Sequence, residues 1–594
     1  MKLKFNGFLV LLVVLVAQIT FAQERTVSGV VSDNAGLPLP GVSVLVKGTQ
    51  SGTQTDFDGK YSIRATPSQV LVFSYIGMKT QEATATSANV NVKLLDDSIQ
   101  LEGVIVGALG IKRSKNSLTS STQVVASQEL TQAANPNVVQ SLVGKVSGLQ
   151  INKSSSGVNG TNRIVLRGSR SITGNNEALV VIDNSISSSA VLQQLPPELI
   201  ESVNVIKGMQ GAALYGEQGV NGVIIVTTVK GKEKGKITVN VNSAIDFETV
   251  SFMPETQQKY GQGWDGVHYP EENGSWGLPF DGVLRPTGLP QADGLELQRP
   301  YSFIKDNVKD FYQTGTTFQN GFSINAGTSD SYALFSANKV KTEFIVNGDQ
   351  LERNSFLFKA GKKIGKLSID GNVNYNYQKS TETSNDLLDD LIQTAGNVDL
   401  SLFKNSGNEG NYTIYFKNPY WTIDNNRNDS RRTFINTIAA LKYDINKNIN
   451  VTYTGNLQFT NRDAQSHINQ YRETPDLAGA GANRNQTSEY FASQSSLRTY
   501  YGDLLVNFDY DLTDDLSLKA NVGSNMQDRN YRITSQGGQN LDIPGWYHIN
   551  NVLSPANPSN LDNRSQKSNR ASVLANVDLG YKNYLFLNVT GRND

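Results

Sequence analysis

The feature that most constrains the fold is a series of long alternating segments after residue 235. In residues 367–377, apolar and aromatic side chains alternate with Ser, Asp and Asn. Residues 449–460 and 571–581 repeat this pattern over about ten residues each. Strands of this length with one apolar and one polar face are typical of transmembrane β-barrels, whereas strands of soluble sandwiches are usually nearer to about five or six residues. The Asn-rich polar face suits a wet lumen, so the pattern predicts a barrel wall.

The same alternation predicts about eleven strands in this region. They are expected at 236–247, 317–327, 331–341, 352–361, 366–378, 433–443, 449–461, 498–511, 516–526, 570–581 and 584–594. From the second strand onward, short turns alternate with mostly long connections. If the first strand enters from the periplasm, every short turn is periplasmic and every long loop is extracellular, as in outer-membrane barrels.

The odd strand count has a consequence for the length of the protein. Plugged outer-membrane transporters have about 22 strands. An unclosed sheet would leave unpaired backbone groups in lipid. The pattern also stops inside a strand at Asp594. We therefore expect the sequence to be the first part of a longer protein and to lack roughly half of its barrel.

The N-terminus predicts export. Lys2 and Lys4 precede an apolar run at 8–17, and a small residue, Ala22, closes a cleavage site before Gln23. This arrangement predicts a signal peptide over residues 1–22. A transmembrane helix would need about 20 apolar residues, and the run is much shorter.

Two further regions have their own local patterns. Residues 25–97 contain short strands separated by Gly, Pro and Asp turns, which predicts a small β-sandwich. Residues 202–228 read SVNVIKGMQGAALYGEQGVNGVIIVTT. Two β-branched runs surround a Gly-rich centre, so this stretch predicts strand, turn, short helix, turn and strand. The earlier pieces SLVGKVSGLQI, RIVLRGSRSI and VVIDN belong to the same mixed α/β unit.

Taken in order, these four pieces of the mixed α/β unit resemble the plug domain of TonB-dependent outer-membrane transporters. The form A-A-L-Y-G…N-G-V resembles the SusC/RagA branch in particular. The front region, with P-L-P-G-V-S-V and T-D-x-D-G-x-Y, resembles the carboxypeptidase-regulatory-like domain of that branch. The resemblance implies a mainly β protein with a β-sandwich, a small α/β plug and the first strands of a 22-stranded antiparallel barrel. The implied order is signal peptide 1–22, sandwich 25–97, TonB box 101–110, plug 118–232 and barrel 236–594.

The resemblance also assigns candidate site residues. A β-prone run between sandwich and plug takes the place of the TonB box, which would add a strand to a partner's sheet edge; the alternative is a last strand of the sandwich. The box residues are Glu102, Gly103, Val104, Ile105 and Val106. The plug-motif residues are Arg167, Gly168, Lys207, Gly208, Leu214, Tyr215, Gly216, Asn221 and Gly222. Arg167, Glu201 and Lys207 are candidates for ion pairs in the lumen.

No catalytic, metal or cofactor pattern is found in the sequence. Cys is absent, and the three His residues are far apart. Two Lys-rich turns, GKEKGKIT and GKKIGKLS, fall short of the phosphate-binding loop, because each has one residue too few and no Ser or Thr after the Lys. A net charge of -1 without a polybasic run argues against nucleic acid as a partner. We therefore expect a protein that is not an enzyme.

One pattern bears on cargo. All four tryptophans, Trp264, Trp276, Trp421 and Trp546, fall in the long loops. Their rings offer flat apolar surfaces to sugars or peptide side chains. The alternative is that they pack the loops together or sit in the interfacial girdle.

The resemblance implies active import of a glycan or an oligopeptide across the outer membrane. It further implies TonB as the energy-coupling partner, a SusD-like surface lipoprotein as a lid, and outer-membrane lipid around the barrel. A siderophore or cobalamin receptor without a lid is the nearest alternative, against which the front sandwich and the plug form argue. A cell-surface adhesin would explain the leader and the sandwich but not the plug.

Overall fold

The structure is a computed structural model. It describes residues 25–594 except 34–35, 50, 76–77, 96–103, 107–111, 115–121, 133–136, 154–157, 159–161, 194, 209, 230–236, 290–294, 384–386, 405–412, 414, 416, 472–485 and 583. The predicted signal peptide lies outside the described residues. The chain divides into two compact units, Met1–Val104 and Ile105–Asp594.

The first unit is the predicted β-sandwich. One sheet has the order β4-β1-β7 and the other β3-β2-β5-β6. The strands are β1 (Arg25–Ser32), β2 (Ser43–Val46), β3 (Gly52–Gln54), β4 (Lys60–Ala65), β5 (Val70–Ser74), β6 (Gln81–Thr84) and β7 (Val92–Lys93). Alternate side chains of each sheet face inward, so that Val27, Val44 and Phe73 are fully buried between them.

The second unit begins with the plug, whose main sheet has the order β10-β15-β16-β13-β14. Its elements are β10 (Thr122–Ala126), α2 (Ser127–Thr131), α3 (Val138–Ser141), β11 (Leu149–Lys153), β12 (Asn162–Leu166), β13 (Leu179–Ile182), β14 (Ser185–Ser187), α4 (Ser189–Leu192), η3 (Pro197–Leu199), β15 (Ile200–Ile206), α5 (Gln210–Tyr215), η4 (Gly216–Gly219) and β16 (Val223–Thr228). The central strands β13 and β16 run parallel and are buried on both faces. Their near-continuous β-branched sequence is what a two-sided burial requires.

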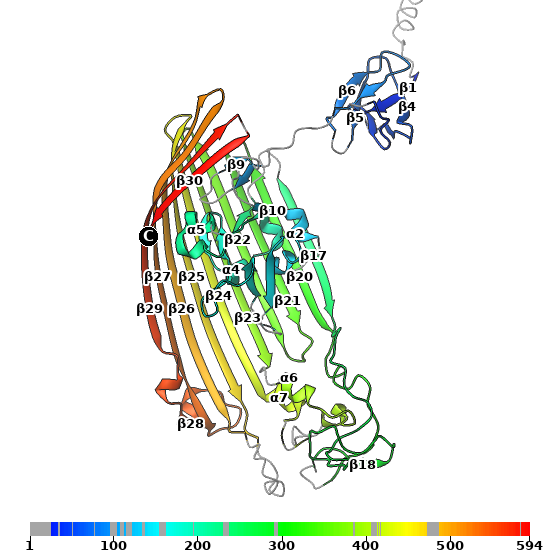
Figure 1. Ribbon diagram of the computed structural model, residues 1–594, viewed down its shortest axis with the longest axis vertical. Helices are drawn as coiled ribbons and strands as arrows, with labels where there is room; N and C mark the ends of the chain where they lie inside the picture. The colour runs from blue at the N-terminus through cyan, green and yellow to red at the C-terminus, as the bar shows by residue number, and fades with distance from the viewer. Residues whose placement is uncertain are drawn as a thin grey trace, which may run out of the picture. The chain divides into compact units, whose positions relative to one another are not determined.

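The rest of the second unit is a large curved sheet, the wall, with the plug on its concave side (Figure 1). Its main strands are β17 (Thr238–Glu248), β20 (Gly315–Gly327), β21 (Ser331–Glu343), β22 (Gln350–Ile364), β23 (Leu367–Thr383), β24 (Asn426–Asp444), β25 (Ile449–Ile468), β26 (Glu489–Thr513), β27 (Leu516–Leu541), β29 (Arg564–Tyr581) and β30 (Leu585–Asn593). Each pairs antiparallel with the next, and β28 (Val552–Pro555) pairs with β27 as a twelfth strand. In this sheet β17 and β30 are the two edges, so the described strands form an open arc.

The structure corrects the expected strand ends. The alternation placed the start of one strand at 498 and the end of the next at 526, but β26 begins at Glu489 and β27 ends at Leu541. Most of the expected loop 527–569 is therefore strand. The ladder between β26 and β27 continues to the pair Glu489–Gln539. The longest missed parts, 489–497 and 527–541, lie at the long-loop end of the wall.

The two faces of the wall differ as the alternation predicted. On β26, Tyr500 and Leu504 are 45% and 47% exposed, whereas Tyr501 and Leu505 are buried. Cross-strand partners can be followed as a row from the outward Phe322 on β20 to Phe459 on β25 and on to Lys567 on β29. This row begins with apolar side chains and ends with a charged one. The outward apolar band is therefore oblique to the rows of paired residues, as the strand tilt of a barrel requires.

The long connections carry short elements of their own, which appear at the opposite end of the wall from the short turns (Figure 1). They are β18 (Leu284–Pro286), β19 (Gln298–Pro300), α6 (Leu387–Ile392), η5 (Leu400–Phe403), α7 (Pro419–Asn425), η7 (Ile549–Asn551) and η8 (Pro558–Asn560). Between the sandwich and the plug, β8 (Val104–Val106) and β9 (Lys112–Ser114) form a separate two-stranded sheet.

Candidate functional site

The plug motif forms two tight turns around α5. Gly208 and Gly222 have φ angles of 79° and 94°, a region that L side chains rarely adopt. A Cβ on Gly222 would lie 2.6 Å from Leu166 Cδ1 and 2.9 Å from the Ile206 carbonyl oxygen. Glycine at this position therefore lets β16 return beside β15. Asn221 secures the turn, since its side-chain amide donates to the carbonyl oxygen of Asn175 at 2.9 Å.

The two cations of the motif do not form the ion pairs considered for them. Lys207 is buried, and its Nζ donates to Ser147 Oγ at 2.7 Å and to Gln123 Oε1 at 3.4 Å. Arg167 has a φ of 58°, and Gly168 follows it with a φ of 85°. Glu201 is exposed on β15. Within the described part of the chain, we find no ion pair for any of these three charged residues.

Two further motif residues, Tyr215 and Gly216, lie at the wall. Tyr215 is buried, and its ring packs with Leu505 of β26 and Leu574 of β29. Gly216 has a φ of 66°, and a Cβ there would meet the side chain of Asp594. Leu214 lies in α5, but its side chain is outside the described part. The helix α5 thus presents one aromatic side chain to the wall.

A buried polar cluster holds the hairpin between β13 and β14 against the wall. Asp183 has a φ of 45°. Its Oδ2 accepts hydrogen bonds from Lys359 Nζ at 3.1 Å and from Asn372 Nδ2 at 3.0 Å. From the plug itself, the Thr228 backbone N donates to Asp183 Oδ1 at 2.9 Å and Thr228 Oγ1 donates to Oδ2 at 2.5 Å. The side chains of Lys359 and Asp183 are only 5% and 14% exposed, so we call this cluster the Asp183 latch.

A second plug carboxylate docks on neighbouring strands. Glu198 Oε1 accepts from Gln319 Nε2 at 3.1 Å and from Asn242 Nδ2 at 3.4 Å. Burial raises the pKa of Glu198, while its own backbone and the nearby Arg353 guanidinium oppose that shift. Arg353 also donates to the Gln193 carbonyl oxygen at 3.0 Å. Both plug carboxylates therefore meet the wall on β17 to β23.

The predicted TonB box is described only in part. Glu102 and Gly103 lie outside the described residues, and Val104, Ile105 and Val106 form β8. The strand pairs with β9 and not with either sheet of the sandwich. Its assignment as the box stays a prediction.

The four tryptophans fall into two groups. Trp421 lies in α7 and is 4% exposed, with its ring edge-to-face against Tyr471 and Lys417 Nζ over it at 5.5 Å. This one packs the loops. Trp264, Trp276 and Trp546 are about half exposed, at 45%, 57% and 47%. Their rings are accessible to a ligand, and their role in cargo binding stays a prediction.

The connections 249–314, 344–349 and 384–425 pack into one unit, which we call the loop body. Its core contains Phe311 from the first connection, Leu391 from α6 and Ile423 from α7. The first and third connections are also joined by hydrogen bonds, such as that from the Gln262 backbone N to Asn397 Oδ1 at 2.6 Å. The loop body is therefore a folded structure with its own apolar core.

One arginine ties the loop body to the wall. Arg427, in β24, donates to Asp349 Oδ1 at 2.9 Å, Thr383 Oγ1 at 2.6 Å and the Gly348 carbonyl oxygen at 2.6 Å. It also donates to the Ile423 carbonyl oxygen in α7 at 3.0 Å. The side chains of Arg427 and Asp349 are 10% and 6% exposed, so a buried guanidinium satisfies four acceptors at once.

The sequence did not single out the residues that dock the plug. Asp183 and Lys359 are 176 positions apart, and the alternation says only which face of a strand is polar. One signal was available: Arg353 and Lys359 are cations among Asn, Ser and Leu at the inward positions of β22 and β23. Such a charge in a closed lumen needs a partner.

Among the described residues there is no helix whose length and apolar character would let it cross a membrane. Among the same residues, no group of three or more His, Asp or Glu is arranged to hold a metal ion.

Two family models match the chain. The model of the CarboxypepD_reg-like domain matches residues 27–106, and the model of the TonB-dependent Receptor Plug Domain matches residues 114–223. The first match ends inside the predicted TonB box, at residue 106. The domain boundaries expected from the sequence stay predictions.

Curated relatives match over longer stretches. TonB-dependent receptor P3 of Formosa agariphila is 28% identical over 531 residues, which are 84% of this chain and 48% of that protein. TonB-dependent receptor SusC of Bacteroides thetaiotaomicron is 34% identical over 270 residues, which are 44% of this chain and 26% of that protein. The chain thus spans about half the length, or less, of these relatives. They are receptors and not enzymes, in agreement with the expectation from the sequence.

A solved structure shows the same fold. The structure of the RagAB peptide importer in the 'open-open' state has a TM-score of 0.63 at 14% identity, covering 82% of this chain and 56% of that one. Sandwich, plug and wall strands follow one another in the order that the sequence predicted. By its domains, relatives and fold, the chain is similar to the SusC/RagA-like TonB-dependent receptors, which are proteins of the outer membrane.

Proposed function

We propose that the protein imports a glycan or an oligopeptide across the outer membrane, with energy delivered through TonB and a SusD-like surface lipoprotein as its partner. The relatives support the class of activity, since one is named SusC and a fold neighbour is titled a peptide importer. The chain itself supplies the plug, the wall and the loop body that such an importer needs.

The observation that carries the proposal is the way in which the plug is seated. It lies on the concave side of the wall, and its contacts combine buried polar clusters with a few apolar ones (Figure 1). Wall side chains even enter the plug, since Phe434 of β24 is buried in the core of the plug. A plug that is held in this way blocks passage until a force displaces it, because breaking a buried ion pair costs about 3–5 kcal/mol.

The edge strand β10 is the place where such work would act first. Among the described strands it pairs only with β15, and it is the first strand of the main plug sheet after the predicted TonB box. A pull on the box would reach β10 before any strand that docks on the wall. The Asp183 latch and Glu198 would hold the remainder of the plug in place during the pull.

Cargo would meet the loop body before the plug. The exposed rings of Trp264, Trp276 and Trp546 are the side chains that we propose for stacking on a sugar or on an aromatic peptide side chain. Trp421 would instead keep the loop body rigid.

The proposal is tested by deleting residues 102–106 in the natural protein. The matched control deletes the five residues 116–120, which lie between β9 and β10 in the sequence. We expect the first deletion to abolish uptake of labelled glycan and peptide pools and capture by TonB, while surface display and cargo binding persist. We expect the control to import normally. Uptake that survives the first deletion would remove the box from this position, and a wild-type protein that binds cargo but never imports it would favour an adhesin.

A further inference from the structure

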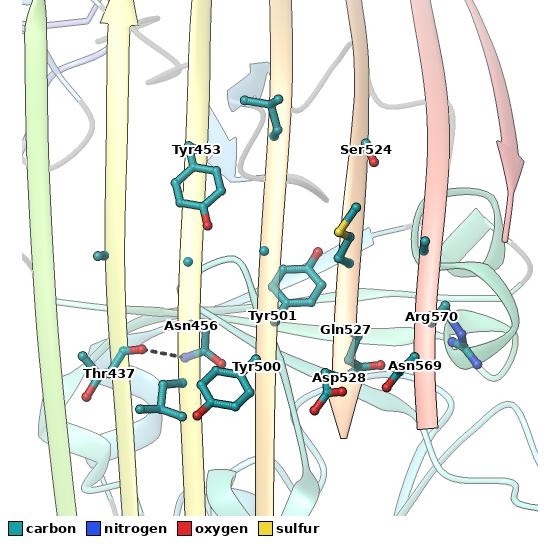
Figure 2. A pocket seen from close by; sticks show the side chains of 17 residues that line it. Thr437, Tyr453, Asn456, Tyr500, Tyr501, Ser524, Gln527, Asp528, Asn569 and Arg570 are labelled. Carbon is teal, nitrogen blue, oxygen red and sulfur yellow. Dashed lines mark hydrogen bonds between the residues drawn. The ribbon is translucent and has the colours of Figure 1, made fainter. Parts of the chain in front are cut away.

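The outer face of the wall contains a hollow that the import function does not use. Its volume is about 910 Å³, and it spans five neighbouring strands from β24 to β29 (Figure 2). Cavities of about 300–1,000 Å³ are the size at which proteins bury most of a small ligand. The residues that border it include Tyr453, Gly455, Tyr501, Gly502, Leu504 and Met526.

Most of these residues point away from the lumen. Tyr453, Leu504 and Met526 are 47%, 47% and 64% exposed, whereas the inward neighbour Tyr501 is 4% exposed. The register agrees, because Gly455 pairs with Gly502, and Gly502 pairs with Met526. The hollow therefore opens toward the lipid.

Its floor is bare backbone. Ala439, Gly455 and Gly502 are direct cross-strand neighbours on β24, β25 and β26. The ring of Tyr453 lies beside both glycines, with its hydroxyl 3.5 Å and 3.6 Å from the places where their Cβ atoms would be. The rows on either side carry large side chains, Leu504 on one and Tyr500 on the other. The result is an apolar groove with aromatic walls.

One end of the groove is cationic. The Arg498 guanidinium lies over the Tyr500 ring at 5.4 Å from its centroid. Lys567 is in the same hydrogen-bonded row, with Asn530 between them, and its Nζ is 3.8 Å from Asp528 Oδ2. Figure 2 shows Asp528 and Asn569 together at this end. Two cations against one carboxylate leave a positive rim at the edge of the apolar surface.

We propose that this groove binds one acyl chain of an anionic outer-membrane lipid, whose phosphate lies at Arg498 and Lys567. Bulk lipid is as apolar as the groove, so burial alone gives no preference for one lipid. Preference for one lipid over bulk lipid must come from the shape of the groove floor and from the cationic rim. A second copy of this chain or an unselective lipid shell would be the other occupants.

The first test fills the floor in the natural protein, purified in detergent and exposed to an equal mixture of phosphatidylglycerol and phosphatidylcholine with identical chains. Neither Gly502 nor the control Gly371 has a positive φ, and a Cβ on either has no neighbour closer than 3.6 Å. Both point outward in the same row, but Gly371 lies outside the groove. We expect Gly502→Leu to lose the lipid that stays bound in native mass spectrometry, and Gly371→Leu to keep it.

The second test concerns the rim. Arg498→Gln and Lys567→Gln should each lower the preference for the anionic lipid about fivefold, since a cation at a membrane surface contributes about 1 kcal/mol. Lys379→Gln, another exposed outward cation, is the control and should leave the preference unchanged. Equal retention by both leucine variants, an unchanged preference in the rim variants, or loss of a protein dimer instead of a lipid would each overturn the proposal.

Discussion

The Asp183 latch makes a quantitative prediction for Lys359→Met. In the native protein Lys359 Nζ contacts Asp183 Oδ2 at 3.1 Å and Thr228 Oγ1 at 2.6 Å. Removal of one partner from a buried ion pair costs about 3–5 kcal/mol, because the other charge is left unpaired. Asp183 keeps its hydrogen bonds from Thr228 and Asn372, so we expect the lower end, about 3 kcal/mol.

This free energy should appear as local opening of the plug. A change of about 3 kcal/mol corresponds to roughly 100-fold in an equilibrium constant. Amide hydrogen exchange of β13 and β16 should therefore accelerate about 100-fold where exchange reports local opening. Peptides from the wall strands β25 and β26 should exchange as before.

A double-mutant cycle with Asp183→Asn isolates the coupling between the two charges. Asn tolerates the positive φ of position 183, so this change removes charge without new backbone strain. The matched control is the outward pair Lys339–Glu352, with side chains 57% and 43% exposed, for which about 0–1 kcal/mol is expected. A coupling at the latch no larger than that of the control pair would refute the reasoning.

Three further predictions concern other parts of the chain. Gly222→Ala places a Cβ 2.6 Å from Leu166 and should lower the melting temperature of the plug, with a cost of at least about 1 kcal/mol, whereas Gly371→Ala should be nearly neutral; equal melting curves would contradict the steric argument. Trp264→Ala, Trp276→Ala and Trp546→Ala should each weaken cargo binding by about 1–3 kcal/mol in calorimetric titration, while Trp421→Ala should destabilise the loop body by about 3–5 kcal/mol; unchanged affinities for the first three would leave the outer surface of the plug as the cargo site. Because burial raises the pKa of Glu198, its docking should be most stable below the ordinary carboxyl range and weaken as the pH rises through the raised pKa; Glu198→Gln should abolish this trend, and a persistent trend in proteolysis of the plug would assign it to another group.

The sequence predicted the middle of each wall strand better than its outer end. Inside the lipid band, alternation marks the strand because apolar side chains must face outward. Above that band the outward positions become polar, as at Arg498 and Lys567, and the pattern disappears although the backbone ladder continues. The start of β26 at Glu489 was missed for this reason.

The site shows a different limit. The plug motif could be predicted from the sequence because its glycines are required by local backbone geometry, as the positive φ of Gly222 shows. The partners of Asp183 could not be predicted, because the local sequence around a carboxylate contains no information about which distant lysine it will contact. Trp421 and Trp264 also look alike in the sequence, and only the fold separates the buried ring from the exposed one.

The shared core of the loop body limits how cargo specificity can be exchanged between relatives. Phe311 and Ile423 come from connections more than a hundred positions apart, yet they pack in one core, and Arg427 fastens it to β24. A chimaera that replaces 249–314 alone would place a foreign surface against the native α6 and α7. Recombination that preserves folding must transfer residues 249–314, 344–349 and 384–425 together, so these segments should be inherited as a block. Among the residues that the structure describes, the connection 542–563 supplies none to that core, so we expect it to diversify separately.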